Sequence, residues 1–151
     1  MVQTKKDPVL AVLSLSGGND GLNCVIPRNN GHYRDARPTI AVPEDQIIPL
    51  TDELGLHPTM GPLKKYWDEG KLAVFVGIGY PTPSYSHFRS MDIWHTCEPE
   101  AIGTEGWLGR ATKQLDPNSE NVLTAVNFGR GLPRALVMDG VPVASVGNLE
   151  T

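Results

Sequence analysis

The sequence predicts an α/β fold with a mostly parallel central sheet and flanking helices. Two short apolar runs, Val9–Leu15 and Leu72–Val76, have the continuous apolar character of strands that are buried on both faces. A helical pattern over His57–Gly70 lies between them, which favours a crossover connection between parallel strands. A chain of 151 residues is enough for one domain with a modest core, so we expect a single domain over residues 1–151.

The segment Gly17–Pro43, which follows the first apolar run, is rich in Gly, Asn, Arg and Pro. It predicts a long loop with a helical turn near His32–Ala36, and loops of this length are commonly functional. In the helix itself, Pro58 suits the first turn and Gly70 suits the C-terminal cap.

Shorter elements are predicted in the second half of the chain. A helix is expected over His87–Thr96 and another near Trp107–Leu115. Val122–Val126 predicts a third strand, and the apolar segments Ala135–Met138 and Val141–Ala144 flank an Asp-Gly turn, which is a hairpin signal. This apolar pattern runs almost to the last residue, so we expect the chain to be the front part of a longer domain.

The composition excludes several classes of protein. Hydrophobic residues make up 40% and charged residues 20%, which is ordinary for a soluble globular chain and unlike a disordered one. The net charge is −4 and no basic stripe is present, so we expect no nucleic-acid partner. The apolar runs are too short for a transmembrane segment, and no signal peptide is visible, so the chain as given is expected to be soluble and cytoplasmic.

Cys24 and Cys97 form no metal-binding motif, and two buried thiols are favoured over a disulfide.

The loop that follows the first apolar run is the first candidate site. Ligands of open α/β sheets bind beyond the carboxyl ends of the strands, and the carboxylate of Asp20 has the oxygen chemistry that holds a cation. Gly18, Asn19 and Asn23 are candidate anion or substrate ligands in the same loop. The alternative is a simple turn, in which the Asn and Asp side chains bond to local backbone. The spacing matches neither a phosphate-binding P-loop nor a dinucleotide fingerprint.

The start of the helix after the second apolar run is the second candidate site. A helix N-terminus offers free N–H groups and positive charge to an anion. Ser86 at this point is either a nucleophile or a helix cap, and His87 is a base, a metal ligand or a structural histidine. Arg110, in a later glycine-flanked stretch, is a candidate anion ligand, with a surface ion pair as the favoured alternative.

Taken in order, several stretches also carry a family resemblance. They are GGNDGLNCVIP at residues 17–27, Tyr33, Arg37–Ile40, Leu56–Met60, Leu63, Trp67, Gly70–Val74, Gly77–Pro81, Ser86–Phe88, Asp92–Trp94 and Gly106–Arg110. In this order they resemble the N-terminal part of the DUF1501 family, a group of bacterial proteins placed near the alkaline phosphatase and sulfatase superfamily. The resemblance implies an alkaline-phosphatase-like fold and the hydrolysis of small-molecule phosphate or sulfate esters.

The resemblance also implies roles for particular residues. Asp20 lies where the superfamily has a metal ligand, and Ser86, with Ser84 second, lies where it has its nucleophile. A divalent cation (Zn²⁺, Mn²⁺, Mg²⁺ or Ca²⁺) is the implied cofactor. The superfamily's other metal ligands come from a later part of the fold, and members of the family are often exported. We therefore expect a metal-dependent ester hydrolase or its N-terminal fragment; the alternative is a non-catalytic binding or exported protein without a complete metal site.

Overall fold

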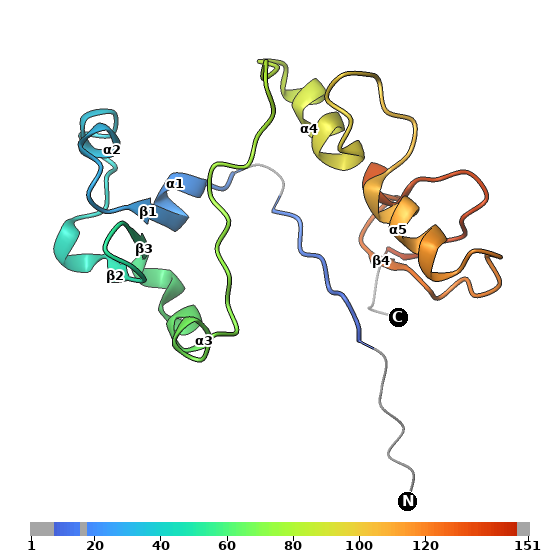
Figure 1. The fold of residues 1–151 in the computed structure, drawn as a ribbon, viewed down its shortest axis with the longest axis horizontal. Helices are drawn as coiled ribbons and strands as arrows, with labels where there is room; N and C mark the ends of the chain where they lie inside the picture. Colours follow the sequence, from blue (N-terminus) through green and yellow to red (C-terminus); the bar gives the residue numbers. More distant parts are fainter. Residues whose placement is uncertain (1–7, 16–17, 148–151) are drawn as a thin grey trace, which may run out of the picture. The chain divides into compact units, whose positions relative to one another are not determined.

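The computed structural model describes residues 8–15 and 18–147 of the chain. These residues gather into two compact units, Met1–Val76 and Gly77–Thr151, and each unit is described by itself. In Figure 1 the elements of the first unit run from blue to green, and those of the second from yellow to red. The expectation of one domain over residues 1–151 stays a prediction.

The first unit contains short helices and one small sheet. In chain order its elements are α1 (Gly21–Cys24), β1 (Val25–Pro27), α2 (Gly31–Asp35), η1 (Glu44–Gln46), β2 (Ile48–Pro49), β3 (Leu54–Leu56), η2 (Pro58–Leu63) and α3 (Lys64–Asp68). The strand β3 lies between β1 and β2, and both pairings are antiparallel. Gly55, at the centre of β3, has no room for a side chain, because a Cβ there would overlap Ile47 and lie 2.9 Å from the carbonyl oxygen of Ile48.

The core of the first unit forms around β1. Ile26 is fully buried and packs in one cluster with Tyr33, Val42 and Ile47. The Tyr33 hydroxyl is satisfied inside this cluster, because it accepts the N–H of Val42 at 3.0 Å. Burial of a side chain such as Ile26 is worth about 1.5–3 kcal/mol, so this cluster stabilises the unit.

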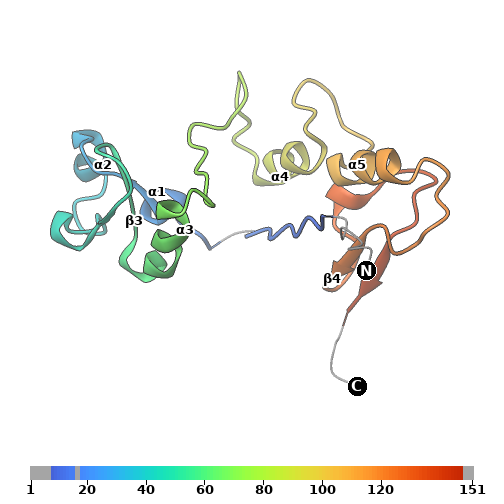
Figure 2. The same ribbon diagram turned by 60° about the horizontal axis from the view of Figure 1, so that its bottom comes forward.

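The second unit is built from two longer helices and a pair of strands. Its elements are α4 (His87–Thr96), α5 (Trp107–Leu115), β4 (Val126–Phe128), η3 (Arg134–Leu136) and β5 (Ala144–Val146). Strands β4 and β5 pair in parallel and lie as adjacent arrows in Figure 2. Both helices contact η3, and the buried residues Ile93, Ala135 and Leu136 come from α4 and η3. Gly106 precedes α5 where the backbone of η3 passes so closely that a Cβ would overlap it.

The predicted fold class is wrong. The structure has one three-stranded antiparallel sheet and one two-stranded parallel sheet, and the described residues contain no large parallel central sheet of the alkaline-phosphatase type. Val9–Leu15 and Leu72–Val76 form no strand (Figure 1), and Val9 and Phe75 are 92% and 81% exposed. A continuous apolar run indicates a tendency to be buried, but it does not specify a pairing partner. The sheets form instead from strands of two or three residues, and β1 pairs with β3 across more than 25 residues of chain.

The helix predictions are confirmed where the signal is local. The expected helices over His87–Thr96 and Trp107–Leu115 are α4 and α5, and the expected turn near His32–Ala36 is α2. The prediction of one helix over His57–Gly70 is wrong, because the segment divides into η2 and α3. Pro62 lies inside η2 and has no N–H to donate to an α-helical ladder.

The strand predictions in the second unit are wrong in detail. Only Val126 of the expected strand Val122–Val126 belongs to β4. The Asp139–Gly140 turn is present, since the N–H of Val141 donates to the carbonyl of Met138 at 3.2 Å. The flanking segments do not form the expected hairpin: residues 134–136 are η3, and β5 pairs in parallel with β4. Pro142 follows the turn and has no N–H to give to a ladder.

Across residues 8–15 and 18–147, none of the helices has both the length and the apolar character needed to cross a membrane.

Candidate functional site

The loop at the start of α1 gathers four of the predicted site residues: Gly18, Asn19, Asp20 and Asn23. Asp20 is the N-cap of α1, and its Oδ1 accepts the N–H of Asn23 at 3.3 Å. The Cys24 thiol donates to Oδ1 of Asn19 at 3.3 Å. Gly18 has a φ of +65°, which glycine adopts without strain. The loop is therefore a helix-capping turn, which is the alternative that the sequence left open.

Two residues that the site prediction omitted complete this loop. Arg37 donates to Oδ2 of Asp20 at 2.8 Å, and the two side chains are only 20% and 40% exposed. Tyr33 donates its hydroxyl hydrogen to Oδ1 of Asn23 at 2.7 Å. The amide of Asn23 in turn donates to the carbonyl of Ile40 at 3.0 Å. The sequence marked Tyr33 and Arg37 only as part of the family resemblance, because nothing local links them to Asp20.

The resemblance implies a divalent cation at Asp20, and the residues of this loop do not fit one. One oxygen of Asp20 is bonded to the Arg37 guanidinium and the other to a backbone N–H. A cation there would have to displace a positive group that already neutralises the carboxylate. Within the described part of the chain, no three His, Cys, Asp or Glu side chains come together as a metal-holding group.

The N-terminus of α4 brings together a turn rich in serine. Ser86 is the N-cap of α4, and its Oγ accepts the N–H of Arg89 at 3.4 Å. Ser84 supports this turn: its Oγ accepts the N–H of Ser86 at 3.2 Å, and its carbonyl accepts the hydroxyl of Ser90 at 2.9 Å. The N–H of Ser84 donates to the hydroxyl of Tyr80 at 3.0 Å. Ser86 is thus an exposed hydroxyl at a fixed helix start.

His87 follows Ser86 but does not pair with it. Its ring is edge-on to the ring of Phe88, with 6.1 Å between the ring centres. Among the described residues, no hydrogen bond joins the His87 ring to Ser86 or to a carboxylate. Consecutive residues at a helix start point in different directions, which explains why the two side chains do not meet.

Arg110 lies on α5 and is bonded within the second unit. Its guanidinium donates to Oε1 of Glu98 at 3.3 Å, to the carbonyl of Glu105 at 2.9 Å and to that of Thr96 at 2.7 Å. The structure therefore shows the ion pair that the sequence favoured. A role for Arg110 in anion binding stays a prediction.

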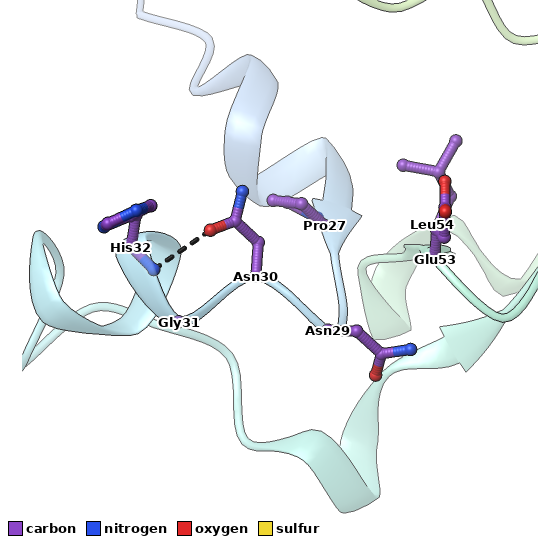
Figure 3. A pocket seen from close by; sticks show the side chains of 7 residues that line it. All are labelled: Pro27, Asn29, Asn30, Gly31, His32, Glu53 and Leu54. Atoms are coloured by element: carbon purple, nitrogen blue, oxygen red, sulfur yellow. Dashed lines mark hydrogen bonds between the residues drawn. The ribbon is translucent and has the colours of Figure 1, made fainter.

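Two cavities lie away from the predicted site residues. The first, of about 480 Å³, is in the first unit and is drawn in Figure 3. It is lined by Pro27, Asn29, Asn30, Gly31, His32, Glu53 and Leu54. The second, of about 270 Å³, is in the second unit. It is lined by Ile78, Gly79, Tyr80, Ile93, Trp94, Cys97 and Pro99.

Both cysteines are free thiols. Cys24 is half-buried, which falls short of the burial expected for both thiols. Cys97 is exposed, which corrects the expectation that both thiols are buried. It caps the C-terminus of α4 in the left-handed conformation, and this position keeps it at the surface.

No family model, curated protein or solved structure matches this chain. The resemblance to the DUF1501 family thus stays a prediction.

Proposed function

We propose that this chain hydrolyses phosphate or sulfate esters and that Ser86 attacks the ester. The observation that carries the proposal is the exposed Ser86 hydroxyl at the N-terminus of α4, a helix of ten residues. The first-turn N–H groups and the positive end of the helix favour the anionic phosphoryl or sulfuryl group. The bonded turn that contains Ser84 and Tyr80 fixes the hydroxyl in place.

The chemistry of such a site is a transfer in two steps. The Ser86 oxygen forms a bond to phosphorus or sulfur while the bond to the ester oxygen breaks. The hydroxyl proton passes to His87 and from it to the departing alcohol. Water then hydrolyses the serine ester, which releases phosphate or sulfate and restores Ser86. His87 is exposed and its ring makes no hydrogen bond to the described residues, but it contacts the Phe88 ring, so the proposed proton transfer requires a rotation of the His87 side chain toward Ser86.

A divalent cation would supply charge neutralisation on the transferring group in an enzyme of the resembled type. The loop at Asp20 does not fit that cation, which favours a second candidate function. In that alternative the chain binds a partner or ligand without catalysis, and the Asp20–Arg37 pair serves only to hold the loop.

The test is the hydrolysis of 4-nitrophenyl phosphate and 4-nitrophenyl sulfate by the full chain, with each of the four candidate cations and with a chelator. Ser86→Asn keeps a side chain that caps helices but removes the nucleophile, so it separates catalysis from folding. Ser145→Ala, which removes a serine hydroxyl from β5 in the same unit, is the control. We expect turnover that Ser86→Asn abolishes and Ser145→Ala retains. If Ser86→Asn retains turnover, the proposed role of Ser86 in hydrolysis is overturned. If the wild type shows no turnover under any condition, the hydrolase proposal is overturned and the binding alternative is supported.

A further inference from the structure

The second cavity lies between the extended segment 78–80 and the C-terminal half of α4. Ile93 is only 5% exposed and forms its base, whereas Trp94 is 55% exposed and forms part of its rim. Tyr80 forms another wall. Its hydroxyl is fixed by the N–H of Ser84 at 3.0 Å, so the ring is held in place. The cavity therefore presents two aromatic side chains over an aliphatic base.

The lining contains no charged residue. Its side chains are aliphatic, aromatic or weakly polar, so a charged or strongly hydrated group would lose its water without gaining a partner here. Aromatic rings pack favourably against one another in offset or edge-to-face contacts, and Tyr80 and Trp94 both line the cavity. A volume of about 270 Å³ suits a fragment and not a whole large ligand.

We infer that this pocket binds a flat, uncharged aromatic group of a small molecule. This assignment rests on the proposed function: the aromatic group is the alcohol part of the ester that Ser86 attacks. Ile93 follows Ser86 by seven residues, so the helical rise separates them by about 10 Å along α4. An ester that reaches both therefore has an elongated aryl alcohol. The exposed rings of Tyr85 and Phe88 flank Ser86 and extend the apolar surface beside it.

The pocket is tested by binding of 4-phenylphenol, an elongated neutral aromatic alcohol, to the full chain in a fluorescence titration. Gly79→Leu places a side chain at the pocket lining, where a Cβ meets nothing within 4 Å, so the variant is able to fold. Gly147→Leu is the matched control, since its Cβ also meets nothing within 4 Å and it lies outside the lining. Trp94→Leu removes an aromatic wall. We expect saturable binding that Gly79→Leu and Trp94→Leu weaken roughly tenfold or more, and that Gly147→Leu leaves unchanged.

Absence of saturable binding, or equal Kd values for the wild type and Gly79→Leu, overturns the inference that the pocket binds an aromatic group. A second measurement compares the hydrolysis of 4-biphenylyl phosphate and 4-nitrophenyl phosphate. If 4-phenylphenol binds in the pocket but neither ester is hydrolysed, the proposed function fails and the pocket stands. If both esters are hydrolysed and Gly79→Leu leaves kcat/KM for the biphenyl ester unchanged, the pocket's role in ester recognition is overturned.

Discussion

Arg134 of η3 donates to Asp92 of α4, with 2.6 Å between Nε and Oδ1. The other oxygen of Asp92 accepts from Arg89 at 2.7 Å, so one carboxylate holds two guanidinium groups. The Asp92 side chain is only 17% exposed, which strengthens both interactions relative to pairs in open solvent. This carboxylate therefore links α4 to η3 and fixes the helix whose N-terminus carries Ser86.

Asp92→Asn is expected to lower the free energy of unfolding by about 1–3 kcal/mol, because it leaves two half-buried guanidinium groups without their charged partner. Urea denaturation followed by circular dichroism measures the change. Glu98→Gln is the control in the same unit, since the Glu98–Arg110 pair is more exposed and is expected to be worth at most about 1 kcal/mol. Equal effects of the two substitutions would contradict a special role for Asp92.

The Asp20–Arg37 pair predicts how the chain responds to metals. A cation that binds only the folded state raises Tm by mass action. Because Arg37 holds the Asp20 carboxylate, we expect the Tm of the wild type to be indifferent to Zn²⁺, Mn²⁺, Mg²⁺ and Ca²⁺. Arg37→Met frees the carboxylate and is expected to gain a metal-dependent rise, which the double variant with Asp20→Asn lacks. A rise in the wild type that Asp20→Asn abolishes would show instead that a cation displaces Arg37.

Asp116 predicts a dependence of stability on pH. Its carboxylate accepts the N–H groups of Asn121 at 2.8 Å and Glu120 at 3.1 Å, and these bonds lower its pKa below the ordinary 3.8. The Thr124 hydroxyl also lowers the pKa of Asp116. Burial raises it, and the hydrogen bonds together outweigh this effect. Because the pKa of Asp116 is lower in the folded chain than in the unfolded chain, its carboxylate stabilises the fold fully at pH values above the ordinary pKa. This contribution is lost as the pH falls through the pKa of the folded state.

Urea denaturation of the wild type and Asp116→Asn from neutral pH into the range below 3.8 checks this prediction. The wild type should lose stability more steeply than the variant in the acid range, and the two curves should converge at the lowest pH. Parallel curves across the whole range would show that the Asp116 hydrogen bonds do not contribute to folding.

The sequence predicted local features of this chain well. The bounds of α4 and α5 follow from a capping serine, a glycine and the spacing of apolar residues, all of which act within a few residues. The sheets were not predicted, because strand pairing depends on residues far apart in the chain. The same holds at the candidate site: the turn at Asp20 is local, whereas Arg37 lies 17 residues away and carries no pattern that points to it.

The exposed segment that ends the first unit has a consequence for proteolysis. Phe75 is 81% exposed in a stretch without regular secondary structure, one residue before the last residue of that unit. Proteases cut most readily at exposed backbone of this kind, and those that prefer aromatic residues would cut after Phe75. A single nick there divides the chain one residue before the boundary in sequence between its two compact units. The capping turn at Asp20 and the helix start at Ser86 would then be carried on separate fragments, each available for its own measurement.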